Sequence, residues 1–139
     1  MSTSMTDFKV SQVLLPLDKV PVVSPQTIFK ESIEKMGDYR LGILCIVEND
    51  GTLAGIITDG DIRRIILKTQ KPFPALFADD SITHSNRCPL KISIDSNVLS
   101  ATNLMEENEI WDLPVVDDAN VLKGVLHLHP IVQHLMNSL

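Results

Sequence analysis

Cysteines and long hydrophobic runs are scarce in this chain of 139 residues. The two cysteines, Cys45 within an apolar run and Cys88 before a proline, provide neither a disulfide framework nor the spacing of a metal site. The longest apolar stretch, residues 41–47, is far shorter than the ~18 residues that a membrane-spanning helix needs. Residues 1–10 lack a basic stretch followed by an apolar one, so no secretory signal is visible. These absences predict a cytoplasmic protein that does not enter a membrane.

Basic residues are scarce toward the C-terminus. Residues 1–91 contain 11 basic and 11 acidic side chains, whereas residues 92–139 contain seven acids and a single base, Lys123, and so account for the net charge of −6. Because phosphate neutralisation by Lys and Arg dominates affinity for nucleic acids, so acidic a chain is a poor candidate for binding them. The neutral part contains one acid-free run with four bases, residues 63–71. That run indicates either a local anion site or a solvated helix face.

The chain contains an internal repeat. Its content of hydrophobic residues, 44%, is typical of one globular domain. With an offset of 69 residues and no gap, VSPQTIFKESIEKM (residues 23–36) aligns with ISIDSNVLSATNLM (residues 92–105), and residues 44–62 align with residues 113–131. Seven pairs are identical: Ser24/Ser93, Met36/Met105, Leu44/Leu113, Val47/Val116, Leu53/Leu122, Gly55/Gly124 and Ile62/Ile131. A chance match would not keep register across two strands, a turn and two helices.

Both repeats predict the same order of elements. A short extended piece and an amphipathic helix precede a buried strand, a polar turn in which Gly51 or Asn120 takes a positive φ, a partner strand and a closing helix. In the two repeats the extended pieces are residues 21–24 and 91–93, the buried strands 43–47 and 113–116, the partner strands 53–57 and 121–126, and the closing helices about 58–69 and 127–137. The predicted fold is α/β (α+β), with two β-α-β-β-α units related by a pseudo-twofold axis, because a single unit would leave one face of its strands open.

Four segments follow from this pattern. Residues 1–20 form a lead-in with an amphipathic turn that Pro16 ends. Residues 21–71 are the first repeat and residues 90–139 the second. Between them, residues 72–89 are expected to be a surface connection with a short helical turn at residues 75–78.

One sequence, GIITDGDIRR (residues 55–64), stands where a buried strand turns into a helix. Such a turn presents free N–H groups and the positive end of the helix dipole, which attract phosphate. The hydroxyl of Thr58 can bind a phosphate oxygen, and the carboxylate of Asp61 can accept both hydroxyls of a ribose. Gly60 allows a ligand to approach the backbone, and Arg63 and Arg64 offer bidentate anion contacts.

The spacing of Thr58 and Asp61 also matches a helix capping box, which needs no ligand. In the second repeat the aligned positions are His127, Leu128, His129 and Pro130. That repeat forms its helix without the Thr and Asp pair, which favours a binding role for the pair in the first repeat. One competent site per chain is therefore expected, or two only if the second repeat holds its ligand differently.

The repeat and the glycine-rich turn together resemble the cystathionine-β-synthase (CBS) domain, and two such domains in tandem are similar to a Bateman module. The resemblance covers about residues 8–137. More narrowly, GIITDGDIRR and GVLHLHPIV are similar to the CBS pair of arabinose-5-phosphate isomerases of the sugar-isomerase type. The stretch LLPLDKVPVVSPQTIFKESI is similar to CBS pairs attached to sugar nucleotidyltransferases.

This resemblance implies a regulatory module with two clefts, often paired into a homodimer. Its implied ligand is AMP, ADP, ATP or a CMP-sugar, with phosphate and ribose held by Thr58 and Asp61 in the turn that also contains Asp59 and Gly60. The base would lie against the starts of two neighbouring strands, at Val22, Val23, Ser24, Gly42, Ile43 and Leu44. A chain this short has no room for a catalytic domain, so the regulated sugar isomerase or nucleotidyltransferase would be attached or a separate partner.

Other interpretations remain open at this point. The chain is alternatively a structural oligomerisation module without a ligand, and the sequence does not decide between a purine and a pyrimidine. An enzyme is a more distant hypothesis, because Asp59 and Asp61 have no nucleophile or histidine spaced with them. Three histidines, His127, His129 and His134, lack the cysteine or acid that would complete a metal site, so no metal is expected.

Overall fold

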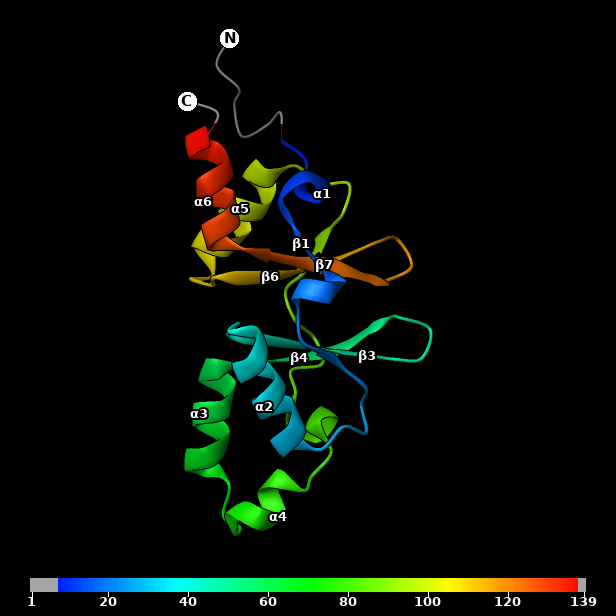
Figure 1. Cartoon of the computed structure of the whole chain (residues 1–139), viewed down its shortest axis with the longest axis vertical. Coiled ribbons are helices and arrows are strands. Elements are labelled where there is room, and N and C mark those ends of the chain that lie inside the picture. The colour runs from blue at the N-terminus through cyan, green and yellow to red at the C-terminus, as the bar shows by residue number, and fades with distance from the viewer. Residues whose placement is uncertain (1–7, 138–139) are drawn as a thin grey trace. The chain divides into compact units, whose positions relative to one another are not determined.

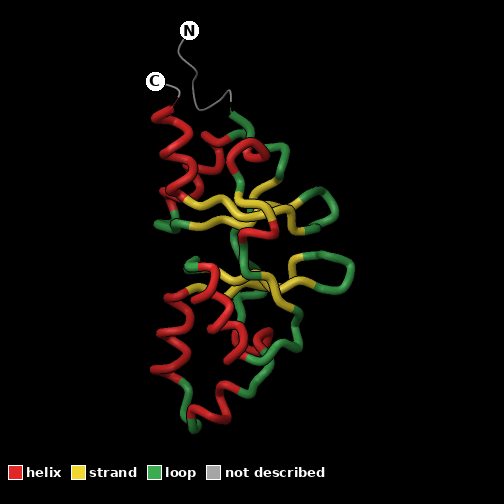
Figure 2. Tube along the Cα trace, in the orientation of Figure 1, coloured by secondary structure: helices red, strands yellow, loops and turns green. Residues whose placement is uncertain are grey.

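The computed structural model describes residues 8–137, which fall into two compact units (Figures 1 and 2). Asp18–Pro89 form the first unit. The second unit combines the described residues up to Leu17 with those from Leu90 onward. Over residues 8–137, every helix is too short or too polar to cross a lipid bilayer.

A three-stranded sheet and two helices form the body of the first unit. Strand β2 (Val22–Val23) pairs in parallel with β3 (Ile43–Val47), which pairs antiparallel with β4 (Leu53–Thr58). Helix α2 (Phe29–Tyr39) connects β2 to β3, and α3 (Asp59–Lys68) follows β4 directly. The core joins alternate strand residues to the apolar faces of the helices: Val23, Phe29, Met36, Leu44, Ile46, Ile57 and Leu76.

The segment after α3 completes the first unit and contains the helix α4 (Phe73–Phe77) and the 3-10 helix η3 (Ser81–His84). Helix α4 confirms the helical turn expected near residues 75–78, although it begins two residues and ends one residue earlier than expected. Many residues of this segment are exposed, and two of its residues also connect it to the rest of the unit. Ser81 is fully buried with its hydroxyl 2.5 Å from that of Ser32, and Asn86 exchanges two backbone hydrogen bonds of 2.9 and 3.0 Å with Ile56 of β4. Polar residues can be buried here because their polar groups are paired.

A second sheet and two helices form the body of the second unit. Strand β5 (Ile92–Ser93) pairs in parallel with β6 (Asp112–Val116), which pairs antiparallel with β7 (Leu122–His127). Helix α5 (Val98–Glu107) precedes β6, and α6 (Leu128–Asn137) follows β7. The predicted α/β fold is confirmed in both units, and so are the left-handed turns at Gly51 (φ 88°) and Asn120 (φ 64°).

Residues near the N-terminus belong to the second unit. Helix α1 (Val10–Val13) confirms the predicted amphipathic turn, and β1 (Leu15–Pro16), which the sequence pattern did not predict, pairs antiparallel with β7. Proline is tolerated there because β1 is an edge strand. The short 3-10 helix η2 (Leu17–Lys19) then leads toward β2. The core of the second unit comprises Phe8, Val10, Val13, Val98, Ala101, Met105, Leu113, Val115, Leu126 and Ile131.

The N-terminal segment and the stretch at residues 79–87 have equivalent places in their units. Leu15 pairs with Val125, and Asn86 pairs with Ile56, which is the residue aligned with Val125 in the repeat. The close approach explains why glycine recurs at positions 55 and 124. A Cβ at Gly55 would lie 2.7 Å from Ser85 Oγ, and one at Gly124 would collide with the carbonyl oxygen of Leu15. Each unit therefore has a segment that lies beside its three strands at the edge of the sheet. We call it the edge segment; it is apolar in the second unit (residues 13–16) and polar in the first (residues 79–87).

Candidate functional site

The turn from β4 into α3 forms a capping box. Thr58 is the N-cap residue, and its Oγ1 accepts a hydrogen bond of 3.2 Å from the backbone N–H of Asp61. Oδ2 of Asp61 accepts a bond of 3.0 Å from the N–H of Thr58. Both side chains thus satisfy amides of their own helix, as the capping interpretation of the sequence requires. A capping role does not use every lone pair of the Asp61 carboxylate.

The other oxygen of Asp61 pairs with an arginine. Oδ1 accepts a bond of 2.6 Å from Arg64 Nη2, and the guanidinium lies beside Gly60, where an added Cβ would be 3.4 Å from Arg64 Nη1. The backbone face of Gly60, expected to admit a ligand, is therefore covered by Arg64. The Arg64 side chain is 53% exposed, and exposed ion pairs contribute only about 0–1 kcal/mol, so an incoming anion can draw it away. Arg63, the other arginine of the pair, is exposed.

The start of β3 lies against this turn. Ile43 is paired with Thr58, and the N–H of Asp59 donates a hydrogen bond of 3.1 Å to the carbonyl of Gly42. A side chain at Gly42 would meet the Asp59 carboxylate, with 2.9 Å between its Cβ and Oδ2. Of the residues expected to contact a base, Gly42 and Ile43 are thus the ones that the fold brings to the turn.

The remaining predicted base contacts lie elsewhere. Val22 and Val23 pair with Cys45 and Ile46, further along β3 than the position opposite the turn. The side chains of Val23 and Leu44 belong to the core, and Ser24 is exposed with its hydroxyl 3.1 Å from that of Thr27.

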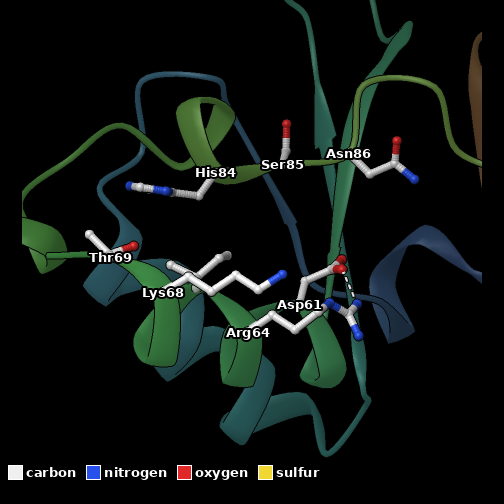
Figure 3. Close-up of a pocket in the computed structure, with 8 residues that line it drawn as sticks. Asp61, Arg64, Lys68, Thr69, His84, Ser85 and Asn86 are labelled. Atoms are coloured by element: carbon white, nitrogen blue, oxygen red, sulfur yellow. Dashed lines mark hydrogen bonds and ion pairs between the residues drawn. The ribbon is translucent and has the colours of Figure 1, made fainter.

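A pocket of about 360 Å³ opens between α3 and the edge segment (Figure 3). The ammonium of Lys68 extends across it toward Asp61, as Figure 3 shows. Sequence reasoning singled out Asp61, Arg64 and the basic run that includes Lys68, but it missed the wall formed by residues 84–86. The lining residues are Asp61, Arg64, Ile65, Lys68, Thr69, His84, Ser85 and Asn86.

An ionic cluster fixes the wall of this pocket. Oδ2 of Asp79 lies 2.5 Å from Lys71 Nζ and 2.8 Å from His84 Nε2. The hydrogen bond from Lys71 has the larger effect and that from His84 the smaller, and both hold the pKa of Asp79 below its usual value. The ring of His84 also lies against Phe29 of the core, with 5.3 Å between ring centroids. His84 is therefore held in place from both sides.

The aligned turn of the second unit has a different arrangement. His127 Nδ1 lies 2.6 Å from Asp112 Oδ1, whereas His129 is exposed and the ring of His134 packs edge-on against Phe8. Pro130 occupies the position of Asp61 and has no side-chain acceptor. Among residues 8–137, no three histidine, cysteine or acidic side chains are grouped so that they could hold a metal ion.

Comparison with known proteins identifies the family. The CBS domain model matches residues 10–68 and 80–136, so the chain belongs to the CBS-domain family and contains a tandem pair. The first match includes the N-terminal segment that completes the second unit, and the second match includes residues 80–87 of the edge segment that completes the first unit. The chain is 33% identical over 122 residues to an uncharacterized protein of Helicobacter pylori strain J99, and the match covers 86% of this chain and 35% of that protein. It is 30% identical over 125 residues to the arabinose 5-phosphate isomerase KdsD of Francisella tularensis, covering 90% of this chain and 37% of the isomerase. The chain thus spans little more than a third of the length of these relatives.

Solved structures share the fold. CBSX2 of Arabidopsis thaliana in complex with AMP superposes with a TM-score of 0.82 at 23% identity, covering 94% of this chain and 97% of that one. The CBS domain pair of MJ0100, in complex with 5'-methylthioadenosine and S-adenosyl-L-methionine, superposes with a TM-score of 0.76 at 20% identity, covering 93% and 96% of the two chains. These likenesses confirm the predicted fold of a CBS pair.

Proposed function

We propose that this CBS pair is a regulatory module that binds a nucleotide beside the turn at Thr58 and Asp61. The observation that supports this most is the pocket next to that turn, lined by Asp61 and by two cationic side chains, Arg64 and Lys68. AMP bound to CBSX2 and the adenosyl compounds bound to MJ0100 support an adenosine ligand. ADP, ATP and a CMP-sugar are the other candidates.

Ligand binding would exchange partners at Asp61. In the structure Asp61 Oδ1 is bonded to Arg64, whereas a bound ribose would present its hydroxyls to the carboxylate and a phosphate would attract the guanidinium. Movement of Arg64 would also open the face of Gly60. The base would then lie toward Gly42 and Ile43, which adjoin the turn.

The regulated activity in this proposal is that of a sugar-phosphate enzyme. The similarity to KdsD supports a sugar-phosphate isomerase, either attached to the module or acting as its partner, and a nucleotidyltransferase is the alternative. The module would act as a cytoplasmic homodimer whose packing shifts when the ligand binds.

Thermal unfolding with AMP, ADP, ATP, CMP and a CMP-sugar tests the binding step. A true ligand binds only the folded state, adds about 2.7 kcal/mol to the free energy of unfolding at a free concentration of 100 Kd, and thereby raises Tm. Asp61→Ala is expected to abolish this rise. It should also lower the stability of the ligand-free protein by about 0.5–2 kcal/mol, because it removes part of the cap of α3.

Asn97→Ala is the matched control, because Asn97 caps α5 in the second unit by accepting a 2.8 Å bond from the N–H of Ser100. It should cost similar stability and keep the ligand-induced rise in Tm. If no nucleotide raises Tm, and Asp61→Ala has only the effect of a lost cap, the proposal fails and a structural oligomerisation module becomes the better explanation.

A further inference from the structure

We infer that the pocket between α3 and residues 84–86 binds a phosphate group, with Lys68 as its principal charge. Where that phosphate belongs to a nucleotide, the inference rests on the proposed function. Where it is free orthophosphate, the inference stands by itself. The chemistry is the same in both cases, a dianion that meets an ammonium and neutral hydrogen-bond donors.

Lys68 is the cation of this pocket that lacks a counter-ion. Arg64 is paired with Asp61, whose carboxylate also accepts the N–H of Thr58, so these opposite charges offset each other. His84 is bonded to Asp79, which also holds Lys71. Within residues 8–137, Lys68 forms no ion pair with a carboxylate. An ammonium directed into a pocket without a partner favours an anion there.

Two neutral hydrogen-bond donors line the same pocket as Lys68. Thr69 provides a hydroxyl from the end of α3, and Asn86 provides an amide from the edge segment. Oδ1 of Asn86 accepts a bond of 3.0 Å from the N–H of Cys88, which leaves its NH₂ group as a donor. Ser85 is not counted as a donor, because its hydroxyl is already bonded to the carbonyl of Ile82.

The second unit shows that the fold does not require these polar side chains. The positions equivalent to His84, Ser85 and Asn86 are Val13, Leu14 and Leu15, and there Val13 is buried and Leu14 packs against the core. The position aligned with Lys68 is Asn137. The same backbone arrangement is thus completed by apolar packing in one unit and by a charged pocket in the other, so the pocket points to a ligand rather than to a structural need.

Calorimetric titration of the whole chain with AMP, adenosine and orthophosphate, at constant ionic strength, tests the inference. Lys68→Gln is expected to weaken AMP binding roughly tenfold or more, the value of one charge-assisted hydrogen bond, and to leave adenosine binding unchanged. Lys68→Arg keeps the charge and should restore most of the affinity. Lys30→Gln is the matched control, an exposed lysine on α2 that lies outside the pocket, and it should change neither affinity.

The orthophosphate titration, followed by amide chemical shifts, separates the two sources of phosphate. Lys68-dependent shifts at Thr69 and Asn86 with orthophosphate alone indicate a free-phosphate pocket, and such shifts with AMP alone indicate the phosphate of the nucleotide. If AMP binds wild type and Lys68→Gln equally and orthophosphate shifts neither amide, the inference is overturned while nucleotide binding stands. If only orthophosphate binds, through Lys68, the pocket stands and the nucleotide proposal fails. If neither binds, both are overturned.

Discussion

At the scale of single residues, Asp61 combines two tasks that are usually separate. One carboxylate oxygen completes the cap of α3 and the other holds Arg64, so both oxygens of Asp61 are bonded within the turn. An arginine held by an exposed ion pair is easily released, because water and salt weaken such a pair. The ion pair therefore keeps the turn ordered without blocking an anionic ligand that binds more strongly.

Gly55 leads to a stability prediction at the same scale. Gly55→Ala should destabilise the first unit by about 1–3 kcal/mol, because the new methyl group would lie 2.7 Å from Ser85 Oγ and 3.0 Å from the carbonyl oxygen of Asn86. Urea unfolding measures the change. Gly37→Ala is the control, since nothing lies within 4 Å of a Cβ there, and replacing a helical glycine should stabilise α2 by up to about 1 kcal/mol. Equal effects at the two positions would show that the edge segment does not press on β4.

At the scale of elements, the ion cluster at Asp79 connects the edge segment to the loop between α3 and α4. Lys71 and His84 hold the pKa of Asp79 below 3.8, its value in an unstructured chain. Because the folded pKa is the lower one, the cluster adds stability above the unfolded pKa and loses it as the pH falls through the folded pKa. Asp79→Asn should thus reduce stability at neutral pH and flatten its acid dependence below about pH 4.

Urea unfolding at several pH values between 2 and 7 measures this effect. Asp118→Asn is a suitable control, because Asp118 is an exposed carboxylate in the β6–β7 turn of the second unit, outside this cluster. A pH profile of Asp79→Asn that runs parallel to that of wild type would contradict the prediction.

The long elements were predictable from the sequence because each has a clear pattern. The apolar run Ile43–Val47 is β3 to the residue, and the closing helix predicted from about residue 58 is α3, with Thr58 as its cap. Strand β1 and the pairing of Asn86 were not predictable, since two residues cannot show a period and a polar segment is typical of loops. The same limit applied to the site. The turn at Thr58–Asp61 has a local motif, whereas residues 84–86 join the pocket only through the tertiary fold.

At the scale of the whole molecule, the boundaries of the two units do not follow the boundaries of the sequence repeats. The N-terminal segment supplies core residues and an edge strand to the second unit. The whole first unit separates this segment from residues 90–137 in the sequence. Deletion of residues 1–17 should therefore destabilise the second unit and spare the first, because Phe8, Val10 and Val13 are lost from its core.

Hydrogen exchange followed by NMR distinguishes the two units in this experiment. Amides of β6 and β7 should lose protection in the truncated protein, and those of β3 and β4 should keep it. A protein in which β3 and β4 lose as much protection as β6 and β7 would show that the first unit also depends on the N-terminal segment.

The discontinuous second unit has a consequence for protein synthesis. Leu15 leaves the ribosome long before its pairing partner Val125 exists, whereas every part of Asp18–Pro89 is translated without interruption. The first unit can thus fold on the nascent chain while the apolar strand β1, which precedes it, has no β7 to pair with. Whatever slows translation between these points prolongs the period in which that strand is open to the wrong partner.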